Sequence, residues 1–379
     1  MQYLLAHTNI WFLIFGGIFC FSLLIQLIYY IFFSRILFWK KKQNTEKQES
    51  VSIVICAKNE AENLEQFLPE ILTQEYPDFE VVVVNDCSED ETEMVLTRLA
   101  QQYPRLKITF IKKDEKFTHG KKLALSLGIK ATKNEWLLLT DADCIPAGKN
   151  WLASMVANFT GKKEIILGFG GYFKKPGLLN KLIRFDTAFI ALQYLSFATS
   201  GMPYMGVGRN LAYKRSLFFR NKGFASHAHI KSGDDDLFVN EVAKKSNTCI
   251  EFSPESFTHS QPENSMFNWF YQKKRHLTTG GFYKKKHKFI LSLEPLTRLL
   301  FYFSFAGLII FQFYIPVILA AFGFRLIVQY IVMIFFTIRL KEKDLLLFLP
   351  LFDFLLPFIS IFAMISNSFN KRAKYQWTK

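Results

Sequence analysis

Residues 135–144 read EWLLLTDADC, an apolar run that ends in acidic residues. Four consecutive apolar residues, Trp136 to Leu139, stand before two carboxylates that flank a single alanine. A short, fully apolar run bounded by polar residues predicts a strand that is buried on both faces. Asp141 and Asp143 are therefore predicted to lie where that strand reaches the edge of its sheet.

Similar apolar runs alternate with helical patterns through the preceding part of the chain. Strands are predicted at residues 51–56, 80–85, 108–111 and 135–140, and helices at residues 59–72, 92–102 and 121–131. Strands that are apolar throughout and joined by helices indicate an α/β fold, with a mostly parallel sheet and helices on both faces. Such sheets bind ligands at the carboxyl ends of their strands, so the residues that follow each strand are candidates for a functional site.

The first candidates are Asp141 and Asp143. Carboxylate oxygens are hard ligands that suit Mg²⁺ or Mn²⁺, and these ions also bind phosphate oxygens. In an extended strand the two side chains would point the same way, whereas a turn would separate them. Two solvated turn residues are the ordinary explanation of an isolated Asp-x-Asp pair, but the position directly after a buried strand favours a metal site.

Asp86 follows a second apolar run, Val81 to Val84, and lies just past the predicted strand. A carboxylate at this position can accept hydrogen bonds from a nucleobase or a ribose. The alternative is an N-cap of the next helix, but Ser88, Glu89 and Asp90 already offer that cap. We therefore predict a nucleotide contact for Asp86.

The turn after the first strand reads AKNEAEN, residues 57–63. The backbone of Ala57 and the side chain of Glu60 are predicted to face the nucleoside. The alternative explanation for Asn59 and Glu62 is a capping box, whose spacing they have and which would satisfy the first backbone N–H groups of the next helix.

Two lysines begin the helix predicted at residues 121–131. Gly120 lets the backbone approach a ligand closely, so Lys121 or Lys122 is predicted to reach a phosphate at the helix start. Two solvated surface lysines are the alternative, and the sequence leaves both open.

Two further clusters lie downstream. Asp234, Asp235 and Asp236 are consecutive and repel one another, so at least one pKa should rise unless a cation is near. A carboxyl group with a raised pKa suits a general base for an acceptor hydroxyl, and an exposed acidic helix start is the alternative. Gln272 and Arg275 share one helix face, where the arginine can bind a diphosphate. The alternative for this segment is a basic helix at a membrane surface.

Composition limits the possible partners. The formal charge of +15 allows nucleic acid or an anionic membrane surface. The basic residues gather beside apolar stretches, as in Lys40–Lys42 and Lys284–Lys286, so membrane lipids account for them and no nucleic acid is expected. The five cysteines are scattered without Cys-x-x-Cys spacing, so neither a disulfide framework nor a zinc site is expected. Free thiols fit a reducing, cytosolic location.

Several segments are apolar enough to enter a membrane. Residues 9–33 are apolar for about 25 positions, which suits a spanning helix and exceeds the core of a signal peptide. Because Lys40–Lys42 follows this run, the positive-inside rule places the N-terminus outside and residue 40 onward in the cytoplasm. Residues 299–322 and 345–365 are predicted as further spans, and residues 326–338 are short for one. Three full spans would leave the basic tail outside, so one of these segments is expected to be re-entrant or interfacial.

The pieces described above resemble glycosyltransferase family two, which has the GT-A fold, and they occur in the family's order. They are Asn59–Glu60, Asn85–Asp86, Asp141–Asp143, Asp234–Asp236 and Gln272–Arg275. The resemblance covers residues 51–280. The flanking apolar segments resemble the membrane-bound branch of the family, which includes polysaccharide synthases and carotenoid or lipid glycosyltransferases.

The resemblance implies roles on the donor side of the site. Asp86 would contact the base, Asp141 would contact the nucleoside and phosphates, and Asp143 would bind the metal. The donor would be a UDP- or GDP-sugar.

The resemblance also implies roles on the acceptor side. Asp234 and Asp235 would match the family's Glu-Asp pair, with Asp235 as the base, although Asp236 allows a shift of register by one. The family's Gln-x-x-Arg-Trp would end at His276, where processive synthases have a tryptophan at the acceptor end of the site. This replacement favours transfer of a single sugar. The glycine-rich segment 206–210 is predicted to line the acceptor side.

The sequence thus predicts a membrane-bound, inverting hexosyltransferase that uses a nucleotide-sugar with Mg²⁺ or Mn²⁺ and glycosylates a lipid or lipid-linked glycan of the cell envelope. The predicted location is a bacterial inner membrane, with the GT-A domain in the cytoplasm. A processive polysaccharide synthase is one alternative, and a non-catalytic nucleotide-binding membrane scaffold is another. The predicted parts are a transmembrane helix at 1–39, a linker at 40–50, the GT-A domain at 51–280, an interfacial segment at 281–298, a transmembrane region at 299–368 and a basic tail at 369–379.

Overall fold

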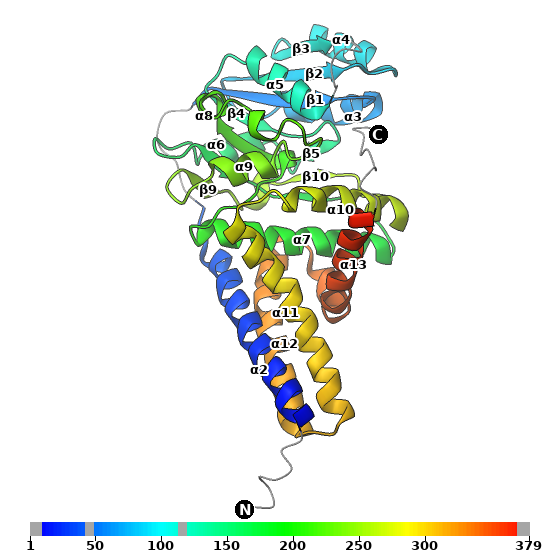
Figure 1. The fold of residues 1–379 in the computed structure, drawn as a ribbon. Helices are drawn as coiled ribbons and strands as arrows, with labels where there is room; N and C mark the ends of the chain where they lie inside the picture. Colours follow the sequence, from blue (N-terminus) through cyan, green and yellow to red (C-terminus); the bar gives the residue numbers. More distant parts are fainter. Residues whose placement is uncertain (1–9, 42–48, 113–119, 370–379) are drawn as a thin grey trace, which may run out of the picture. The chain divides into compact units, whose positions relative to one another are not determined.

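The computed structural model describes residues 10–41, 49–112 and 120–369. Of these, residues 368 and 369 are described as backbone only. The chain divides into two compact units (Figure 1). The larger unit holds Trp39–Tyr283 and the residues from Ser366, and the smaller unit holds the residues up to Phe38 together with Lys284–Ile365. Most of the linker and of the basic tail named above lies outside the described residues.

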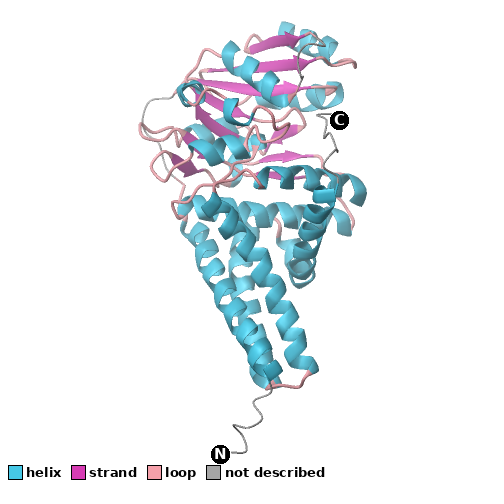
Figure 2. Ribbon diagram, in the orientation of Figure 1, coloured by secondary structure: helices cyan, strands magenta, loops and turns pink. Residues whose placement is uncertain are grey.

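The larger unit is built on a seven-stranded sheet (Figure 2). Its strand order is β3-β2-β1-β4-β8-β6-β9, and within this sheet only β8 runs antiparallel to its neighbours. The mostly parallel sheet predicted from the apolar runs is therefore confirmed. The strands are β1 (Val51–Ala57), β2 (Phe79–Asp86), β3 (Leu106–Ile111), β4 (Trp136–Leu139), β6 (Ile165–Leu167), β8 (Leu211–Lys214) and β9 (Thr248–Ile250).

Different helices cover the two faces of this sheet. Side chains alternate along a strand, so Ile53 of β1 faces a core that it shares with apolar residues of α3, α4 and α6. Val54 of β1 and Val84 of β2 face the opposite side, where α5 packs. A Cβ atom at Gly128 of α5 would lie 2.8 Å from both valines, so glycine permits this close approach. These helices are α3 (Ala61–Leu72), α4 (Thr92–Gln102), α5 (Lys121–Ala131) and α6 (Trp151–Val156).

A small sheet and four more helices complete the larger unit. In the small sheet β10 lies between β5, to which it is antiparallel, and β7, to which it is parallel. Strand β5 of this small sheet begins at Cys144, directly after the acidic pair that follows β4. The elements are β5 (Cys144–Pro146), β7 (Gly170–Tyr172), β10 (Thr258–Ser260), α7 (Leu178–Thr199), α8 (Arg215–Arg220), α9 (Asp236–Val242) and α10 (Met266–Gly280).

Within the described residues, four helices are long and apolar enough to cross a membrane. The predicted span at 299–322 is wrong in its bounds, because the chain turns between α11 and α12. Gln312 and Tyr314 have positive φ angles there, and α12 then begins with a proline in its first turn. Residues 326–338 belong to a full-length helix. The four helices are α2 (Ile10–Ser34), α11 (Lys285–Ile310), α12 (Ile315–Leu340) and α13 (Leu349–Phe369).

A charged network lies inside the smaller unit. The buried carboxylate of Asp353 lies 3.1 Å from Nη1 of Arg298 and 3.0 Å from Nη2 of Arg325, and it accepts a hydrogen bond from Tyr302 at 2.6 Å. Arg298 also pairs with Glu294 at 2.6 Å. Two arginines thus face two carboxylates. Buried charges are costly unless they are paired, so this network determines which faces of α11, α12 and α13 meet.

Replacement of Asp353 by asparagine is expected to destabilise this unit. The substitution keeps the size of the side chain but leaves Arg298 and Arg325 buried with one carboxylate between them. Breaking a buried ion pair costs about 3–5 kcal/mol, so the free energy of unfolding in mild detergent should fall by that amount. Leu347→Ala is the control, because Leu347 is 81% exposed in the segment before α13. Equal stability of the two variants would contradict the assignment.

Candidate functional site

Three adjacent strands deliver candidate residues to one edge of the main sheet. β2, β1 and β4 are parallel neighbours, so their carboxyl ends lie at the same edge. Ala57 ends β1, Asp86 ends β2, and Asp141 follows two residues after β4. Ala57 and Asp86 are fully buried. The structure therefore brings these three predicted residues together at the edge where parallel sheets bind ligands.

The two turns that follow β1 and β2 are tied to each other. Asn59 donates its backbone N–H to Oγ of Ser88 at 2.9 Å, and its side-chain oxygen accepts from the N–H of Glu89 at 2.8 Å. Asn59 has a φ angle of 55°, a left-handed conformation that asparagine tolerates. The two turns thus form one connected surface around Ala57 and Asp86.

The capping box considered as the alternative explanation of Asn59 and Glu62 is not formed. Helix α3 begins at Ala61, and Glu60 stands at the N-cap position without a capping hydrogen bond from its side chain. The N–H of Ala61 is instead satisfied by Oδ2 of Asp90, at 3.1 Å, from the neighbouring turn. The local spacing was misleading because the partner comes from another element.

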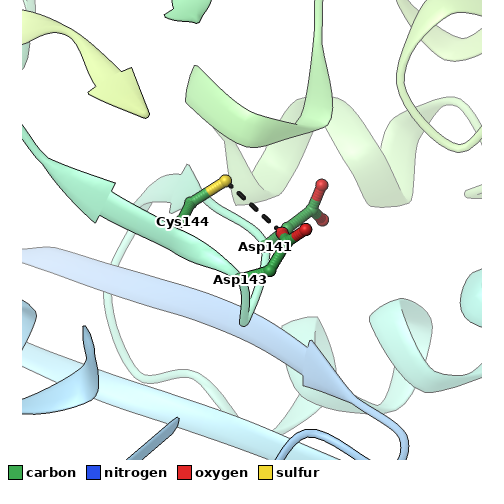
Figure 3. A group of neighbouring side chains, drawn as sticks. All are labelled: Asp141, Asp143 and Cys144. Atoms are coloured by element: carbon green, nitrogen blue, oxygen red, sulfur yellow. Dashed lines mark hydrogen bonds between the residues drawn. The ribbon is translucent and has the colours of Figure 1, made fainter. Parts of the chain in front are cut away.

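Asp141 and Asp143 lie in a tight turn between β4 and β5 (Figure 3). The N–H of Cys144 donates to the carbonyl of Asp141 at 3.1 Å and closes the turn, and Ala142 is buried between the two carboxylates. One ligand atom from each of Asp141, Asp143 and Cys144 lies within 4.8 Å of the others. The turn therefore gathers three groups that could hold a metal ion.

The chemistry of these groups fits a hard cation. Burial raises the pKa of Cys144, and the charges of Asp143 and Asp141 raise it further, so the thiol remains protonated. Its sulfur lies 3.6 Å from Oδ1 of Asp143 and donates to it. The ionised ligands are then two partly exposed carboxylates, which suit Mg²⁺ or Mn²⁺.

Lys121 links this turn to the acidic triplet. Its Nζ lies 2.7 Å from Oδ1 of Asp141 and 3.2 Å from Oδ2 of Asp234. Burial would lower the pKa of Lys121, but these two carboxylates raise it well above its usual value. An ammonium that stays charged at the start of α5 offers a phosphate a cationic partner.

Lys122 has different partners. Its Nζ donates to the backbone carbonyls of His227 at 2.8 Å and Ile230 at 2.9 Å. Burial lowers the pKa of Lys122 to about 8. Of the two predicted lysines, Lys121 contacts the acidic residues directly, and Lys122 holds the backbone of the segment that leads to them.

The three carboxylates of the triplet have different surroundings. Asp235 accepts hydrogen bonds from the backbone N–H groups of Gly208 and Asp236, each at 2.7 Å. Burial, followed by the charges of Asp234 and Asp236, raises the pKa of Asp235 to about 7. The rise expected for consecutive carboxylates is thus found. Asp234 pairs with Lys121, and burial also raises the pKa of Asp236, so Asp235 and Asp236 are the two carboxyl groups of the triplet whose pKa is raised, as a general base requires.

Helix α10 carries Gln272 and Arg275 on one face. The hydroxyl of Tyr172 donates to Oε1 of Gln272 at 3.3 Å, and the guanidinium of Arg209 lies 4.4 Å from the centre of the Tyr172 ring. Burial would lower the pKa of Arg209, but Tyr172 and then the acidic turn, including Asp143, raise it. Arg209 therefore lies close to the candidate cation site.

His276 follows Gln272 by one helical turn on α10. The surrounding protein atoms, followed by the positive charges of Arg275 and Arg209, lower the pKa of His276 below its usual value, although its side chain is exposed to solvent. The imidazole is therefore neutral at physiological pH. A neutral, polar ring stands at the position where the family resemblance implies a tryptophan.

The sequence analysis missed Arg209, Gly208 and Tyr172 as individual site residues. Because β8 is antiparallel, the residues before it reach the edge where the other strands end. The glycine-rich segment 206–210 was a signal that this loop approaches the site, but it did not single out Arg209. Nothing in the sequence around Tyr172 indicates its contact with α10.

Comparisons with known proteins agree with this geometry. Residues 52–220 match the family model described as glycosyl transferase family 2. Glycosyltransferase AglE of Haloferax volcanii is 30% identical over 172 residues, which make up 45% of this chain and 52% of that protein. The poly-beta-1,6-N-acetyl-D-glucosamine synthase of Staphylococcus epidermidis is 30% identical over 123 residues, or 31% of this chain and 28% of that protein. The chain thus spans about half, or less, of the length of these relatives.

A solved structure shares the fold. A mannosyltransferase from Pyrobaculum calidifontis, in complex with GDP-Man and Mn²⁺, has a TM-score of 0.59, with 89% of this chain and 96% of that chain covered at 19% identity. This likeness is evidence for the GT-A fold alone. Together, the family match and this likeness show that residues 52–220 lie in a domain that matches glycosyl transferase family 2 and has the GT-A fold, in a chain that also carries helices apolar enough to span a membrane.

Proposed function

We propose that this protein is a membrane-bound, inverting glycosyltransferase that moves a sugar from a nucleotide-diphosphate sugar to a lipid or lipid-linked glycan. The observation that carries the proposal is the position of Lys121, whose ammonium contacts Asp141 of the candidate cation site and Asp234 of the triplet. This contact brings a site for the leaving diphosphate next to a candidate general base. Displacement at a sugar carbon requires the leaving diphosphate and the general base to lie on opposite sides of that carbon.

The donor would bind along the carboxyl edge of the main sheet. A UDP- or GDP-sugar fits this edge, because the buried residues of the first two turns suit a nucleoside and the lysine and arginine suit its diphosphate. Gln272 would contact the donor from α10. The proposed donor-binding residues are Ala57, Glu60, Asp86, Lys121, Lys122, Asp141, Gln272 and Arg275.

Asp143, with Asp141 beside it, would hold Mg²⁺ or Mn²⁺. Such a cation, when bound, supplies positive charge to the leaving nucleoside diphosphate. Arg275 and Lys121 would stabilise the same negative charge, the guanidinium through paired hydrogen bonds.

Asp235 would act as the general base. Its carboxylate would take the proton of the acceptor hydroxyl while that oxygen forms a bond to the anomeric carbon. The bond from this carbon to the phosphate oxygen breaks on the opposite side, so the configuration at the carbon inverts. The N–H groups of Gly208 and Asp236 hold the carboxylate in place.

The pH dependence of transfer should report the ionisation of the Asp235 carboxyl group. The group must be ionised to act as a base, so activity is expected to fall as the pH drops through its pKa of about 7. An ordinary aspartate would lose activity only near pH 4. The measurement is the acid limb of kcat/KM against pH, at saturating metal. A midpoint below pH 5 would rule out Asp235 as the base with this raised pKa.

The apolar helices support the proposed acceptor and the proposed location. A cytoplasmic domain joined to membrane spans can reach an acceptor whose lipid portion stays in the bilayer, and the bacterial inner membrane is the proposed site. Lys40 and Lys41 after α2 favour a cytoplasmic position of the domain. Addition of a detergent-solubilised lipid extract should therefore raise donor turnover above hydrolysis alone.

The end of α13 supports three crossings with a fourth helix that does not cross. Lys274 of α10 donates to Oγ of Ser366 at 2.8 Å, and the side chain of Asn367 donates to the carbonyl of Lys274 at 2.8 Å. These contacts lie within the larger unit and favour a position of Ser366 and Asn367 on the same side of the membrane as the GT-A domain. The positive-inside rule likewise predicts that the basic end of the chain lies on the cytoplasmic side.

The decisive experiment is a screen of nucleotide-sugars with the purified full-length protein. Release of nucleoside diphosphate is measured with Mn²⁺, with Mg²⁺ and with a chelator. One donor should be turned over far faster than the others, and only with metal. Indifference to both metal and nucleotide would instead support a non-catalytic scaffold.

A processive polysaccharide synthase is the second candidate, and the similarity to a poly-beta-1,6-N-acetyl-D-glucosamine synthase favours it. His276 argues for single transfer, because an imidazole offers less apolar surface than tryptophan for stacking on a sugar chain. The length of the product on a sizing column separates the two candidates.

A further inference from the structure

Asp236 differs from its two acidic neighbours in accepting hydrogen bonds from two side-chain hydroxyls of the protein. Its Oδ2 accepts hydrogen bonds from the hydroxyls of Thr279 and Tyr283, the latter at 2.7 Å, and its Oδ1 accepts from the N–H of Leu237 at 2.7 Å. Asp236 and Tyr283 are both buried. A carboxylate with three donors around it is poorly placed to take a proton from a substrate.

The two hydroxyls come from Thr279 at the end of α10 and from Tyr283, three residues after the helix. The same helix carries Gln272, which accepts from Tyr172 at 3.3 Å. Gln272 and Thr279 are seven residues apart, about two helical turns or 10 Å. Helix α10 is therefore attached to the site at two points, with Arg275 and His276 between them.

The charge of Asp236 also affects the neighbouring base. After burial and the charge of Asp234, the charge of Asp236 is the next cause that raises the pKa of Asp235. Asp236 also provides one of the two N–H groups that bind the carboxylate of Asp235. One residue thus contacts both the proposed base and the helix that carries Arg275.

We propose that Asp236 is a positioning residue, whose carboxylate fixes helix α10 against Asp235 so that Arg275 and the base act on the same donor sugar. This proposal rests on the proposed function. The proposal also identifies which two residues of the triplet match the family's Glu-Asp pair. Asp236 binds helix α10, so Asp234 and Asp235 remain for the reaction.

The test compares Tyr283→Phe and Asp236→Asn with Tyr76→Phe in the full-length protein. The Tyr76 hydroxyl donates to the carbonyl of Glu49 at 2.6 Å, before the start of β2 and away from the site, so it controls for the loss of one buried hydrogen bond. We expect kcat to fall about tenfold in Tyr283→Phe, as for the loss of a hydrogen bond to a charged group, with the donor KM within about threefold of wild type. Tyr76→Phe should keep the wild-type kcat.

Asp236→Asn provides a readout that a purely structural role would not move. Removal of the charge should lower the pKa of Asp235, so the acid limb of kcat/KM should shift to lower pH. An unchanged limb together with a wild-type kcat in Tyr283→Phe would overturn the proposal. So would abolition of transfer at every pH in Asp236→Asn while Asp235→Asn stays active, since Asp236 would then be the base. If Asp236→Asn does not fold, the kcat of Tyr283→Phe decides alone.

The failure of this proposal can be distinguished from the failure of the proposed function. A wild-type protein that is inactive with every donor would overturn both. An active wild-type protein whose variants behave like the wild type would overturn this proposal alone.

Discussion

Asp143→Ala is expected to reduce metal-dependent transfer by about a thousandfold, because a bound cation stabilises the leaving diphosphate by several kcal/mol. The substitution removes the carboxylate that accepts from the Cys144 thiol and leaves Asp141 as the remaining acidic ligand at the turn. The measurement is the initial rate of transfer across a Mn²⁺ titration.

A second readout separates loss of the cation from loss of the fold. Wild-type protein should gain thermal stability when Mn²⁺ and nucleoside diphosphate are added together, and Asp143→Ala should not. Glu75→Ala is the matched control, because Glu75 is an exposed carboxylate in the loop before β2. If Asp143→Ala kept near-normal turnover, the metal-binding role of Asp143 would be wrong.

Asp235→Asn is expected to reduce kcat by about 10²–10⁴-fold, the range of general base catalysis. Asparagine keeps an oxygen that can accept from the N–H of Gly208, so the loop should retain its structure. It cannot take a proton from the acceptor. The measurement is kcat for transfer, together with the affinity for nucleoside diphosphate and Mn²⁺, which should be unchanged.

Asp78→Asn is the control for this substitution. Asp78 lies directly before β2, where its side chain accepts a hydrogen bond from Ser50, and its charge lies at the opposite end of the strand from Asp86. Retention of more than a tenth of the wild-type kcat in Asp235→Asn would show that another group accepts the proton.

Much of the sheet could be predicted because its pattern is local. The predicted helices at 92–102 and 121–131 have the same bounds as α4 and α5. The apolar runs at 80–85 and 135–140 became β2 and β4 within one residue at each end. In a parallel sheet the strand ends share an edge, so the grouping of Asp86 with Asp141 followed from the same pattern.

The rest depended on contacts between distant elements. The direction of β8 is not encoded in its four residues, yet it brings Gly208 to Asp235 and Arg209 to Tyr172. The turn between α11 and α12 was missed because Gln312 and Tyr314 adopt left-handed conformations without glycine. The proline in the first turn of α12 was the one local signal, and it is typical of a helix start.

The charged network of the smaller unit bears on how the protein is made. An arginine at the centre of a helix opposes insertion by about 2.5–3.5 kcal/mol, and Arg325 occupies such a position in the otherwise apolar α12. Its carboxylate partner, Asp353, is synthesised later, in α13. We therefore expect α12 to remain beside the insertion machinery until α13 emerges, so that Asp353 neutralises Arg325 before α12 is released into the lipid.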